Sequence, residues 1–390
     1  MKLDDDFGKE IQKTLQTVGE RINPNPEFIE HLNKAVLQSC HDKRIRIAVI
    51  FGGCSPEYSV SLQSAYAVIS HMDKLKFTPV LIGITQQGDW YYFIGSPEKL
   101  IDDTWYNKTD CTSTAVSPNR TKHAILKYDG KRMEEICIDA VFPVLHGRNG
   151  EDGTVQGVFE LAGIPIVGCG VLASALCMDK DRAHKLAHAA GIPVPRSYVL
   201  DKGIDTQTAL SQAEEIGYPL FVKPIKAGSS FGITKVMDRQ ELSSAIKLAF
   251  EYDDKAIIEE TISGFEVGCA ILGNHTLTVG EVDEIELSDG FFDFTEKYTL
   301  KTSAIHVPAR IDAATAKQVK HTAETIYRAL NCQGFARVDM FLSASGQIVF
   351  NEVNTIPGFT AHSRFPNMLK AVGISFEQVI TTAIELAVKK

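Results

Sequence analysis

The stretch "GFARVDMFLSASGQIVFNEVN" (residues 334–354) predicts two neighbouring antiparallel strands. Both halves are rich in apolar residues, and the "SASGQ" between them favours a hairpin turn. Arg337 and Asp339 stand two residues apart in the first strand, and Glu352 and Asn354 do so in the second. Because side chains alternate between the two faces of a strand, each pair is expected to point to one face.

The polar face of this hairpin predicts a metal site. Asp339, Glu352 and Asn354 offer hard oxygen donors, which suit a Mg²⁺ ion that also binds nucleotide phosphates and water. Arg337 beside them is suited to stabilise developing negative charge. The alternative is a polar stripe that faces solvent, and it is disfavoured because the residues in between look buried on the opposite face, although Asn351 breaks the alternation. These apolar residues are Ala336, Val338, Met340, Val349 and Val353.

A second segment, "KPIKAGSSFG" (223–232), predicts a phosphate-binding loop. Glycines flank Ser229 and Ser230 between two β-type runs, and Lys223 and Lys226 stand close by. Successive backbone N–H groups in such a loop can surround phosphate oxygens while the lysines offset their charge. The alternative is a serine-rich hairpin tip without a ligand.

Other nucleotide motifs are absent or incomplete. The sequence contains no G-x-x-x-x-G-K-[ST] P-loop. The run "VGCGVLA" (167–173) fits the G-x-G-x-x-A fingerprint of dinucleotide-binding folds, but "HAAGI" near residue 190 lacks the acidic residue that would hold the ribose. A nicotinamide-dependent oxidoreductase is therefore disfavoured.

Composition narrows the class of protein. A chain of 390 residues with 44% apolar content predicts two or three domains. The net charge of −9 and the lack of a basic block with interleaved aromatic residues argue against nucleic acid as a partner. No apolar run approaches membrane-spanning length and no signal peptide is evident, so a cytoplasmic protein without a membrane partner is expected. The eight cysteines form no C-x-x-C pair and are expected to be free thiols, mostly buried.

The order of predicted elements suggests an α/β part followed by α+β parts. Residues 44–168 carry apolar runs separated by helical patterns, which is typical of a parallel sheet. After "AAGIPVPRSYVL", strands and hairpins follow with fewer helices between them, as in antiparallel domains. Residues 1–43 read as two amphipathic helices split by "NPNP"; they are interpreted as a packing or partner-binding appendage, with disorder as the alternative.

Six motifs in this order resemble the D-alanine:D-alanine ligase family of the ATP-grasp superfamily. They are "HGRNGEDGTVQG", "MDKDRAHKL", "KPIKAGSSFG", "EKYTL", "GFARVDMF" and "NEVNTIPGFTAHS", and the resemblance covers roughly residues 45–388. Within the family the chain most resembles the VanG-type D-alanine:D-serine ligases of vancomycin-resistant bacteria.

The resemblance implies an ATP-grasp fold and a ligase reaction. The expected division is a helical extension (1–43), an N-terminal parallel α/β substrate domain (44–168), a central ATP-grasp subdomain (169–257) and a C-terminal ATP-grasp subdomain (258–390). In the family, ATP phosphorylates the carboxylate of one D-alanine, and the amine of a second D-amino acid attacks the acyl phosphate to make a peptidoglycan precursor. ATP, two Mg²⁺ or Mn²⁺ ions, small-molecule substrates and a homodimer are therefore expected.

The resemblance also implies residue roles. Asp339, Glu352 and Asn354 correspond to the metal ligands, and Arg337 to the arginine that stabilises the oxyanion of the tetrahedral intermediate. The nucleotide contacts implied are Lys180 and Lys223 to the phosphates, Ser229 and Ser230 over the γ-phosphate, and Glu259 and Glu266 to the adenine amine and the ribose hydroxyls. Tyr298 and Lys297 lie on the implied closing loop, which excludes water from the acyl phosphate.

Substrate contacts follow from the same resemblance. Glu57 matches the carboxylate that takes the ammonium of the first D-alanine, where a buried cation needs a paired charge. The alternative for Glu57 is a cap on the helix that begins near Ser59. His146 belongs to the same implied site, and the groups implied to hold the acceptor carboxylate are Gly358 and Ser363.

The acceptor is expected to be D-serine. The chain has "GEVDEIELSDGFFDF" (280–294) with Asp283, where ordinary members usually carry a proline-containing segment, and Asp283 is the candidate reader of the serine hydroxyl. Its alternative is a surface or capping aspartate. The retained "EKY" argues against the D-lactate-making branch.

Three rival functions stay open at this point. An ordinary D-alanine:D-alanine ligase is the alternative within the family. A non-catalytic relative would be expected to lose a metal ligand or the arginine, and both are present. A carboxylate–amine ligase for another substrate is disfavoured by Glu57 and "HGRNGEDG", which lie in the substrate domain.

Overall fold

The computed structural model describes residues 44–228, 231–287, 303–360 and 362–389. The chain divides into two units, Met1–Ile45 and Arg46–Lys390, and nearly all of the first lies outside the described residues. The two helices predicted for residues 1–43 therefore lie outside them as well.

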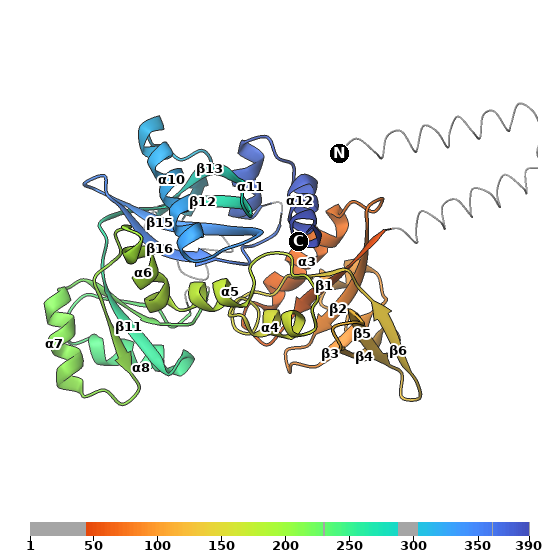
Figure 1. Cartoon of the computed structure of the whole chain (residues 1–390). Coiled ribbons are helices and arrows are strands. Elements are labelled where there is room, and N and C mark those ends of the chain that lie inside the picture. The colour runs from red at the N-terminus through yellow and green to blue at the C-terminus, as the bar shows by residue number, and fades with distance from the viewer. Residues whose placement is uncertain (1–43, 229–230, 288–302, 361, 390) are drawn as a thin grey trace, which may run out of the picture. The chain divides into compact units, whose positions relative to one another are not determined.

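The first sheet has seven strands in the order β6-β5-β4-β3-β2-β1-β7 (Figure 1). Strands β1 and β7 are parallel, and a parallel bridge from Val141 to Ile166 extends this part of the sheet. The strands are β1 (Ile45–Gly52), β2 (Phe77–Ile84), β3 (Trp90–Phe93), β4 (Cys111–Val116), β5 (Ala124–Tyr128), β6 (Met133–Cys137) and β7 (Ala140–Pro143). The helices of this region are α3 (Tyr58–His71), the short 3₁₀ helix η1 (Pro97–Leu100) and α4 (Thr154–Leu161).

The prediction of a parallel sheet needs a correction. It holds for β1 and β7, but each neighbouring pair from β2 to β6 is antiparallel, so the sheet is mixed. The sequence pattern missed this meander because β3 to β6 are short and have few buried side chains. In β6 only one of five side chains is buried, which leaves little apolar alternation to detect.

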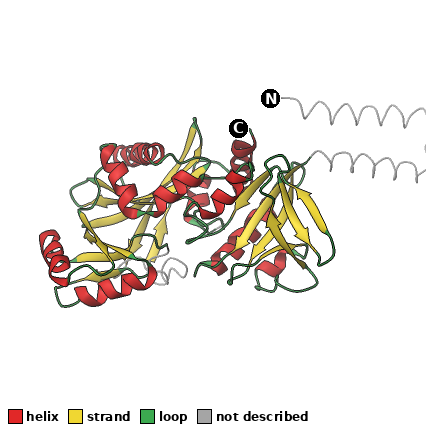
Figure 2. Ribbon diagram, turned by 60° about the horizontal axis from the view of Figure 1, so that its bottom comes forward, coloured by secondary structure: helices red, strands yellow, loops and turns green. Residues whose placement is uncertain are grey.

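The second sheet has four antiparallel strands in the order β10-β9-β11-β8. Helices α7 and α8 lie against this sheet (Figure 2). Their small side chains Ala213 and Ala249 share a core with Val222 and Ile258 of the sheet. Asp205 begins α7 by accepting a hydrogen bond from Thr208 N. The elements are β8 (Ser197–Asp201), α7 (Thr206–Ile216), β9 (Leu220–Pro224), β10 (Thr234–Val236), α8 (Leu242–Tyr252) and β11 (Lys255–Glu260).

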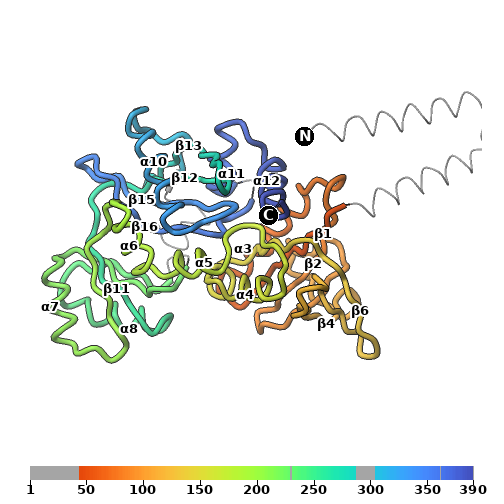
Figure 3. Tube along the Cα trace, in the orientation of Figure 1, coloured from red at the N-terminus to blue at the C-terminus, as the bar shows by residue number. Residues whose placement is uncertain are grey.

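The third sheet has five antiparallel strands in the order β14-β13-β12-β15-β16. Strands β12 and β15 lie side by side although α10 separates them in sequence (Figure 3). The strands are β12 (Gly264–Gly273), β13 (Leu277–Leu287), β14 (Ser303–His306), β15 (Phe335–Ser343) and β16 (Ile348–Asn354). The helices around it are α5 (Val171–Met178), α6 (Lys180–Ala189), α10 (Ala313–Ala329), α11 (Arg364–Ala371) and α12 (Phe376–Val388).

The two faces of this third sheet differ in chemistry. On one face Val267 and Val338 pack with Val319 and Ile326 of α10 in a buried apolar core. The opposite face carries the polar residues of the predicted hairpin, because side chains alternate along each strand. The hairpin itself is confirmed, with Gly346 in the turn at φ +81°.

A β-bulge explains why Asn351 breaks the alternation. Asp339 pairs with Glu352, whereas Met340 pairs with Phe350, so Asn351 is the extra residue on β16. The bulge exchanges the faces beyond it, and Phe350 joins the apolar core with Met340. Val349 is buried as expected, but it is not part of that core.

The predicted division at residues 168 and 257 stays a prediction in detail. Strand β11 runs through residue 257, so a boundary between the second and third sheets lies nearer to residues 261–263.

Seven cysteines lie in the described ranges and all are free thiols, four of them buried. In these ranges no single helix is long and apolar enough to cross a membrane; α11 and α12 reach that length only as a pair bent by 102°.

Candidate active site

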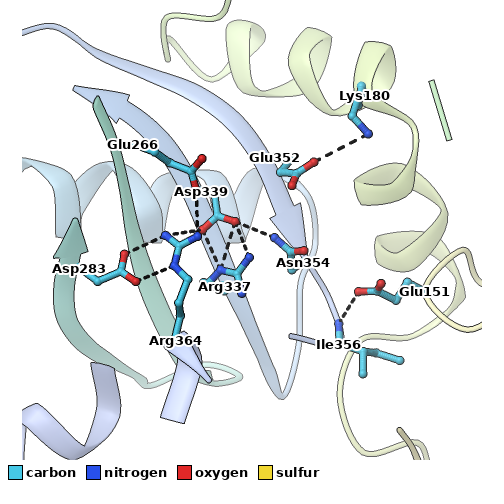
Figure 4. A network of polar contacts seen from close by, with 10 residues as sticks. All are labelled: Glu151, Lys180, Glu266, Asp283, Arg337, Asp339, Glu352, Asn354, Ile356 and Arg364. Atoms are coloured by element: carbon cyan, nitrogen blue, oxygen red, sulfur yellow. Dashed lines mark hydrogen bonds and ion pairs between the residues drawn. The ribbon is translucent and has the colours of Figure 1, made fainter. Parts of the chain in front are cut away.

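A row of paired residues crosses four strands of the third sheet, and three of the four carry carboxylates. Gly268 on β12 pairs with Asp283 on β13 and with Asp339 on β15, and Asp339 pairs with Glu352 on β16. Residues directly opposite each other point to the same face. The next pair along the hairpin is Arg337 with Asn354, so the four residues predicted from the hairpin lie together (Figure 4).

Asp339 is the centre of this row. Arg337 donates to its carboxylate from Nε at 2.8 and 3.1 Å and from Nη2 at 2.7 Å. Asn354 Nδ2 donates to Asp339 Oδ2 at 2.8 Å, and Arg364 Nη2 lies 3.4 Å from Oδ1. A buried carboxylate requires such compensation. The arrangement therefore holds a charged Asp339 in one orientation.

The donor set fits a divalent cation that is completed by other ligands. Asp339 and Glu352 supply two carboxylates, and Asn354 supplies an amide oxygen if its side chain turns from its present contact. The described part of the chain contains no group of three or more His, Cys, Asp or Glu side chains placed to hold a metal. Two carboxylates with open positions for phosphate and water are typical of Mg²⁺ at a nucleotide.

Arg364 is a site residue that the sequence interpretation missed. Its Nε and Nη2 donate to the two oxygens of Asp283 at 2.6 and 2.8 Å, and its Nη1 donates to Glu266 Oε1 at 2.8 Å (Figure 4). Gly268 makes room for this guanidinium, since an added Cβ would overlap Arg364 Nη2 and Asp283 Oδ1. The only sequence signal was the position of Arg364 directly after Ser363.

Two predicted contacts are thus held by one arginine. Asp283 is fully buried. Glu266 lies two residues before Gly268 on β12, and so on the same face of the strand as Gly268. A surface or capping role for Asp283 finds no support, because both of its oxygens accept from Arg364.

The two lysines predicted to hold phosphates lie beside this row. Lys180 Nζ donates to Ala227 O at 2.9 Å and lies 3.8 Å from Glu352 Oε2. Lys223 donates to the carboxylate of Glu259 on the neighbouring strand β11. Burial opposes ionisation of Glu259, but Lys223, with His184 and Lys180, outweighs it and lowers the pKa of that carboxyl below its usual value.

Glu57 lies against two loops of the site. It stands at the N-terminus of α3, but its side chain does not cap the helix, which disfavours the capping alternative. An added Cβ on Gly147 would overlap Glu57 Oε2, and one on Gly228 would come within 2.9 Å of it. Gly228 directly precedes Ser229 and Ser230, which lie outside the described residues.

His146 and Glu151 bind the backbone of one residue, Ile356, in the loop after β16. His146 Nδ1 donates to Ile356 O at 2.9 Å, and Ile356 N donates to Glu151 Oε1 at 3.0 Å. Burial, with a contribution from Arg337, lowers the pKa of His146 to about 4, so the ring is neutral at pH 7. Burial and then the neighbouring Glu57 raise the pKa of Glu151 to about 8.

Glu151 was also missed, although it stands inside the quoted "HGRNGEDG" motif. Its Oε2 accepts from Gly147 N at 2.8 Å, so one carboxyl joins the loop beside Glu57 to the loop after β16. No local pattern predicts a contact between segments about 205 residues apart.

The predicted acceptor residues meet at the start of α11. An added Cβ on Gly358 would lie 2.9 Å from Ser363 Oγ, which accepts from Thr360 N at 3.1 Å. Ser363 directly precedes Arg364, so this segment borders the row of carboxylates. The predicted closing-loop residues Lys297 and Tyr298 lie outside the described residues.

The fold and the site define an ATP-grasp enzyme: the second sheet contributes Lys223, helix α6 contributes Lys180, and the third sheet contributes the metal-type oxygen donors. Comparison with known proteins narrows this class. Residues 46–169 match the family described as "D-ala D-ala ligase N-terminus", and residues 186–385 match "D-ala D-ala ligase C-terminus".

Individual relatives cover nearly the whole chain. The VanG D-Ala:D-Ser ligase of Enterococcus faecalis has a solved structure that is 58% identical with a TM-score of 0.82, and covers 88% of this chain and 99% of that chain. The vancomycin B-type resistance protein VanB of Enterococcus faecalis is 45% identical over 352 residues, which are 89% of this chain and 99% of VanB. A D-alanine–D-alanine ligase of Caldicellulosiruptor bescii is 44% identical over 353 residues, which are 89% of this chain and 96% of that protein.

The chain belongs to the D-alanine–D-alanine ligase family. It is an ATP-dependent ligase with the ATP-grasp fold, and the family uses a divalent metal.

Proposed function

We propose that this protein ligates D-alanine to D-serine with ATP and thereby makes a dipeptide precursor of peptidoglycan for vancomycin resistance. The observation that carries the proposal is the row of Asp283, Asp339 and Glu352 with Arg364 placed between them and next to Ser363. The 58% identity to a VanG D-Ala:D-Ser ligase supports the choice of acceptor.

The proposed chemistry begins with transfer of the γ-phosphoryl group to the carboxylate of D-alanine, which gives an acyl phosphate. Two anions must approach each other, so the reaction needs positive charge and alignment more than a covalent nucleophile. Lys180 and Lys223 supply two such charges. Bound Mg²⁺ or Mn²⁺, as two ions at Asp339, Glu352 and Asn354, would neutralise further phosphate charge.

In the second step the neutral amine of the acceptor attacks the carbonyl carbon of the acyl phosphate. The bond from that carbon to the phosphate oxygen then breaks, phosphate leaves, and the nitrogen loses a proton to give the amide. Glu57 is proposed to hold the ammonium of the first D-alanine, and His146 to support the same site. Arg337 is proposed to stabilise the oxyanion of the tetrahedral intermediate. Its guanidinium is already oriented, because Nε and Nη2 both donate to the carboxylate of Asp339, which suits a preorganised site.

The acceptor is proposed to be read through Asp283 and Arg364. D-serine and D-alanine differ by one hydroxyl, and a site with a hydrogen-bond partner for it discriminates far better than an apolar pocket does. Asp283 fixes the guanidinium of Arg364 at the start of α11, beside the proposed acceptor residues Gly358 and Ser363. Asp283 therefore acts on the acceptor through Arg364, because its own oxygens are already bonded.

A competition assay tests the proposed function. Wild-type protein with ATP, Mg²⁺ and D-alanine is given an equal concentration of D-serine, and the two dipeptides are separated and quantified. We expect D-alanyl-D-serine to predominate. A product that is mainly D-alanyl-D-alanine would favour the ordinary ligase, which the 44% identity to the Caldicellulosiruptor bescii protein supports.

The same assay tests Asp283. Asp283→Ala is expected to weaken D-serine use while D-alanine use stays nearly unchanged, a relative loss of about 1 to 3 kcal/mol in transition-state stability. The milder Asp283→Asn, which keeps the size of the side chain, should shift the ratio in the same direction. Glu251→Ala, at an exposed position of α8, serves as the control. An unchanged product ratio in both Asp283 variants would remove this residue from acceptor choice.

Deletion of residues 1–43 is expected to leave turnover within about twofold of the full chain. Each motif lies after Ile45, and the described site draws its side chains from Arg46–Lys390. Steady-state phosphate release by the truncated and full-length proteins measures this. Lost activity in a folded truncation would assign the extension to the site or to a required dimer.

The protein is also proposed to be a homodimer, and light scattering of the truncated and full-length forms tests this. A cytoplasmic location remains a prediction.

A further inference from the structure

Glu259 has one carboxylate oxygen without a hydrogen-bond partner in the described part of the chain. Its Oε2 accepts from Lys223, whereas Oε1 is buried and has no donor. The same is true of His184 Nδ1, which lies 3.7 Å from that oxygen. Only 2% of the Glu259 side chain and 4% of the His184 side chain is exposed. Two buried polar atoms without partners thus face each other.

The orientation of His184 is set by its other nitrogen. Nε2 lies 2.8 Å from Asn351 O, and a carbonyl oxygen can only accept, so Nε2 carries a hydrogen. The ring also packs edge-on against Phe350, with centroids 5.5 Å apart. These contacts hold Nδ1 toward Glu259.

Glu259 needs a second partner if Lys223, its present partner, binds the nucleotide. Lys223 is proposed to hold phosphate when ATP is bound, and a buried carboxylate that loses its cation is strongly destabilised. The charged groups around Glu259 and His184 are Lys223 on β9, Lys180 on α6 and, next to Lys180, Glu352 on β16. His184 faces the oxygen that Lys223 does not occupy.

We propose that His184 is a positioning residue for the nucleotide: with a hydrogen on both ring nitrogens, it donates from Nε2 to Asn351 O and from Nδ1 to Glu259 Oε1, and so keeps Oε2 aimed at Lys223 or at the bound base. The inference rests on the proposed role of Glu259 toward the adenine amine. His184 also links Glu259 to the proposed metal ligand Glu352. Its Nε2 contacts Asn351 O, and Asn351 is the bulge residue directly before Glu352.

Two substitutions separate the two nitrogens of the ring. In His184→Gln the longer amide places its nitrogen near the former Nε2, which keeps a donor for Asn351 O and removes the one toward Glu259. In His184→Asn the shorter amide places its nitrogen near the former Nδ1, which keeps a donor for Glu259 and removes the other contact. His188→Gln, at an exposed position one turn further along α6, is the matched control.

The test measures the affinity for ADP with Mg²⁺ by calorimetry, without any D-amino acid. We expect the dissociation constant to rise roughly ten- to a hundredfold in His184→Gln, the effect of losing one hydrogen bond to a charged group. It should stay within about twofold in His184→Asn and in the control. Steady-state assays should show the same change in KM for ATP, with little change in KM for D-alanine.

The opposite order of the two variants would overturn the proposal. If His184→Asn binds ADP more weakly than His184→Gln, the residue acts only as an anchor of β16. Wild-type affinity for ADP in His184→Gln would also overturn the proposal. If His184→Gln does not fold, His184→Asn decides alone, and a loss of ADP affinity of more than threefold in that variant contradicts the proposal. Because no D-amino acid is present, a failed D-serine assay leaves this result unaffected.

Discussion

Glu352→Ala is expected to lower turnover by orders of magnitude while the fold survives. Glu352 lies directly opposite Asp339 on the polar face of the third sheet, and its side chain is 25% exposed. Its removal takes a charged donor from a cation that the nucleotide phosphates also need. The loss of core packing is small, because the apolar core lies on the opposite face.

Steady-state turnover as a function of Mg²⁺ concentration measures this effect, and thermal unfolding verifies the fold. Gln347→Ala is the matched control, since Gln347 is exposed in the turn of the same hairpin. Near-normal turnover of Glu352→Ala at low Mg²⁺ would refute the assignment of Glu352 as a metal ligand.

Arg337→Lys is expected to lower kcat by roughly 10²- to 10³-fold, the usual cost of losing one oxyanion donor. A lysine supplies a point charge in place of a planar fork, so it cannot reproduce the Nε and Nη2 contacts of Arg337 with Asp339. The guanidinium is also buried, where solvent cannot replace a missing donor.

Two measurements separate the possible roles of Arg337. A lower kcat with an unchanged Mg²⁺ requirement indicates oxyanion stabilisation, whereas recovery at high Mg²⁺ indicates that Arg337 only orients Asp339. Arg310→Lys is the control, because Arg310 makes a similar forked contact with Glu284 but is 51% exposed. A loss of only about twofold in Arg337→Lys would make this arginine structural.

The β15–β16 hairpin was predictable because both of its signals are local. Alternation with a period of two placed Arg337 and Asp339 on one face, and the turn residues fixed which strands are neighbours. The bulge at Asn351 was seen only as a break in the pattern, since an extra residue on one strand is defined by its partner strand. The direction of β3–β6 was missed for the same reason. Strand pairing depends on neighbouring strands, and short segments with few buried side chains do not specify them.

Long-range contacts of the site were beyond such patterns. The motif containing Glu151 was quoted without a role for that residue, and His184 stood unremarked in "MDKDRAHKL". Each acquires a partner only when α6, β11 and the loop after β16 are brought together.

The sequence by itself determined the family, the order of the motifs and the residue types suited to a cation and to phosphate, because these follow from local spacing and side-chain chemistry. Only the tertiary structure decided which buried charges meet. Arg364 joins Asp283 and Glu266 because the register of β12 and β13 puts Gly268 beneath the start of α11, where a side chain would exclude the guanidinium. Buried ion pairs depend on separations of a few ångströms between distant segments, and the packing of strands and helices sets those separations.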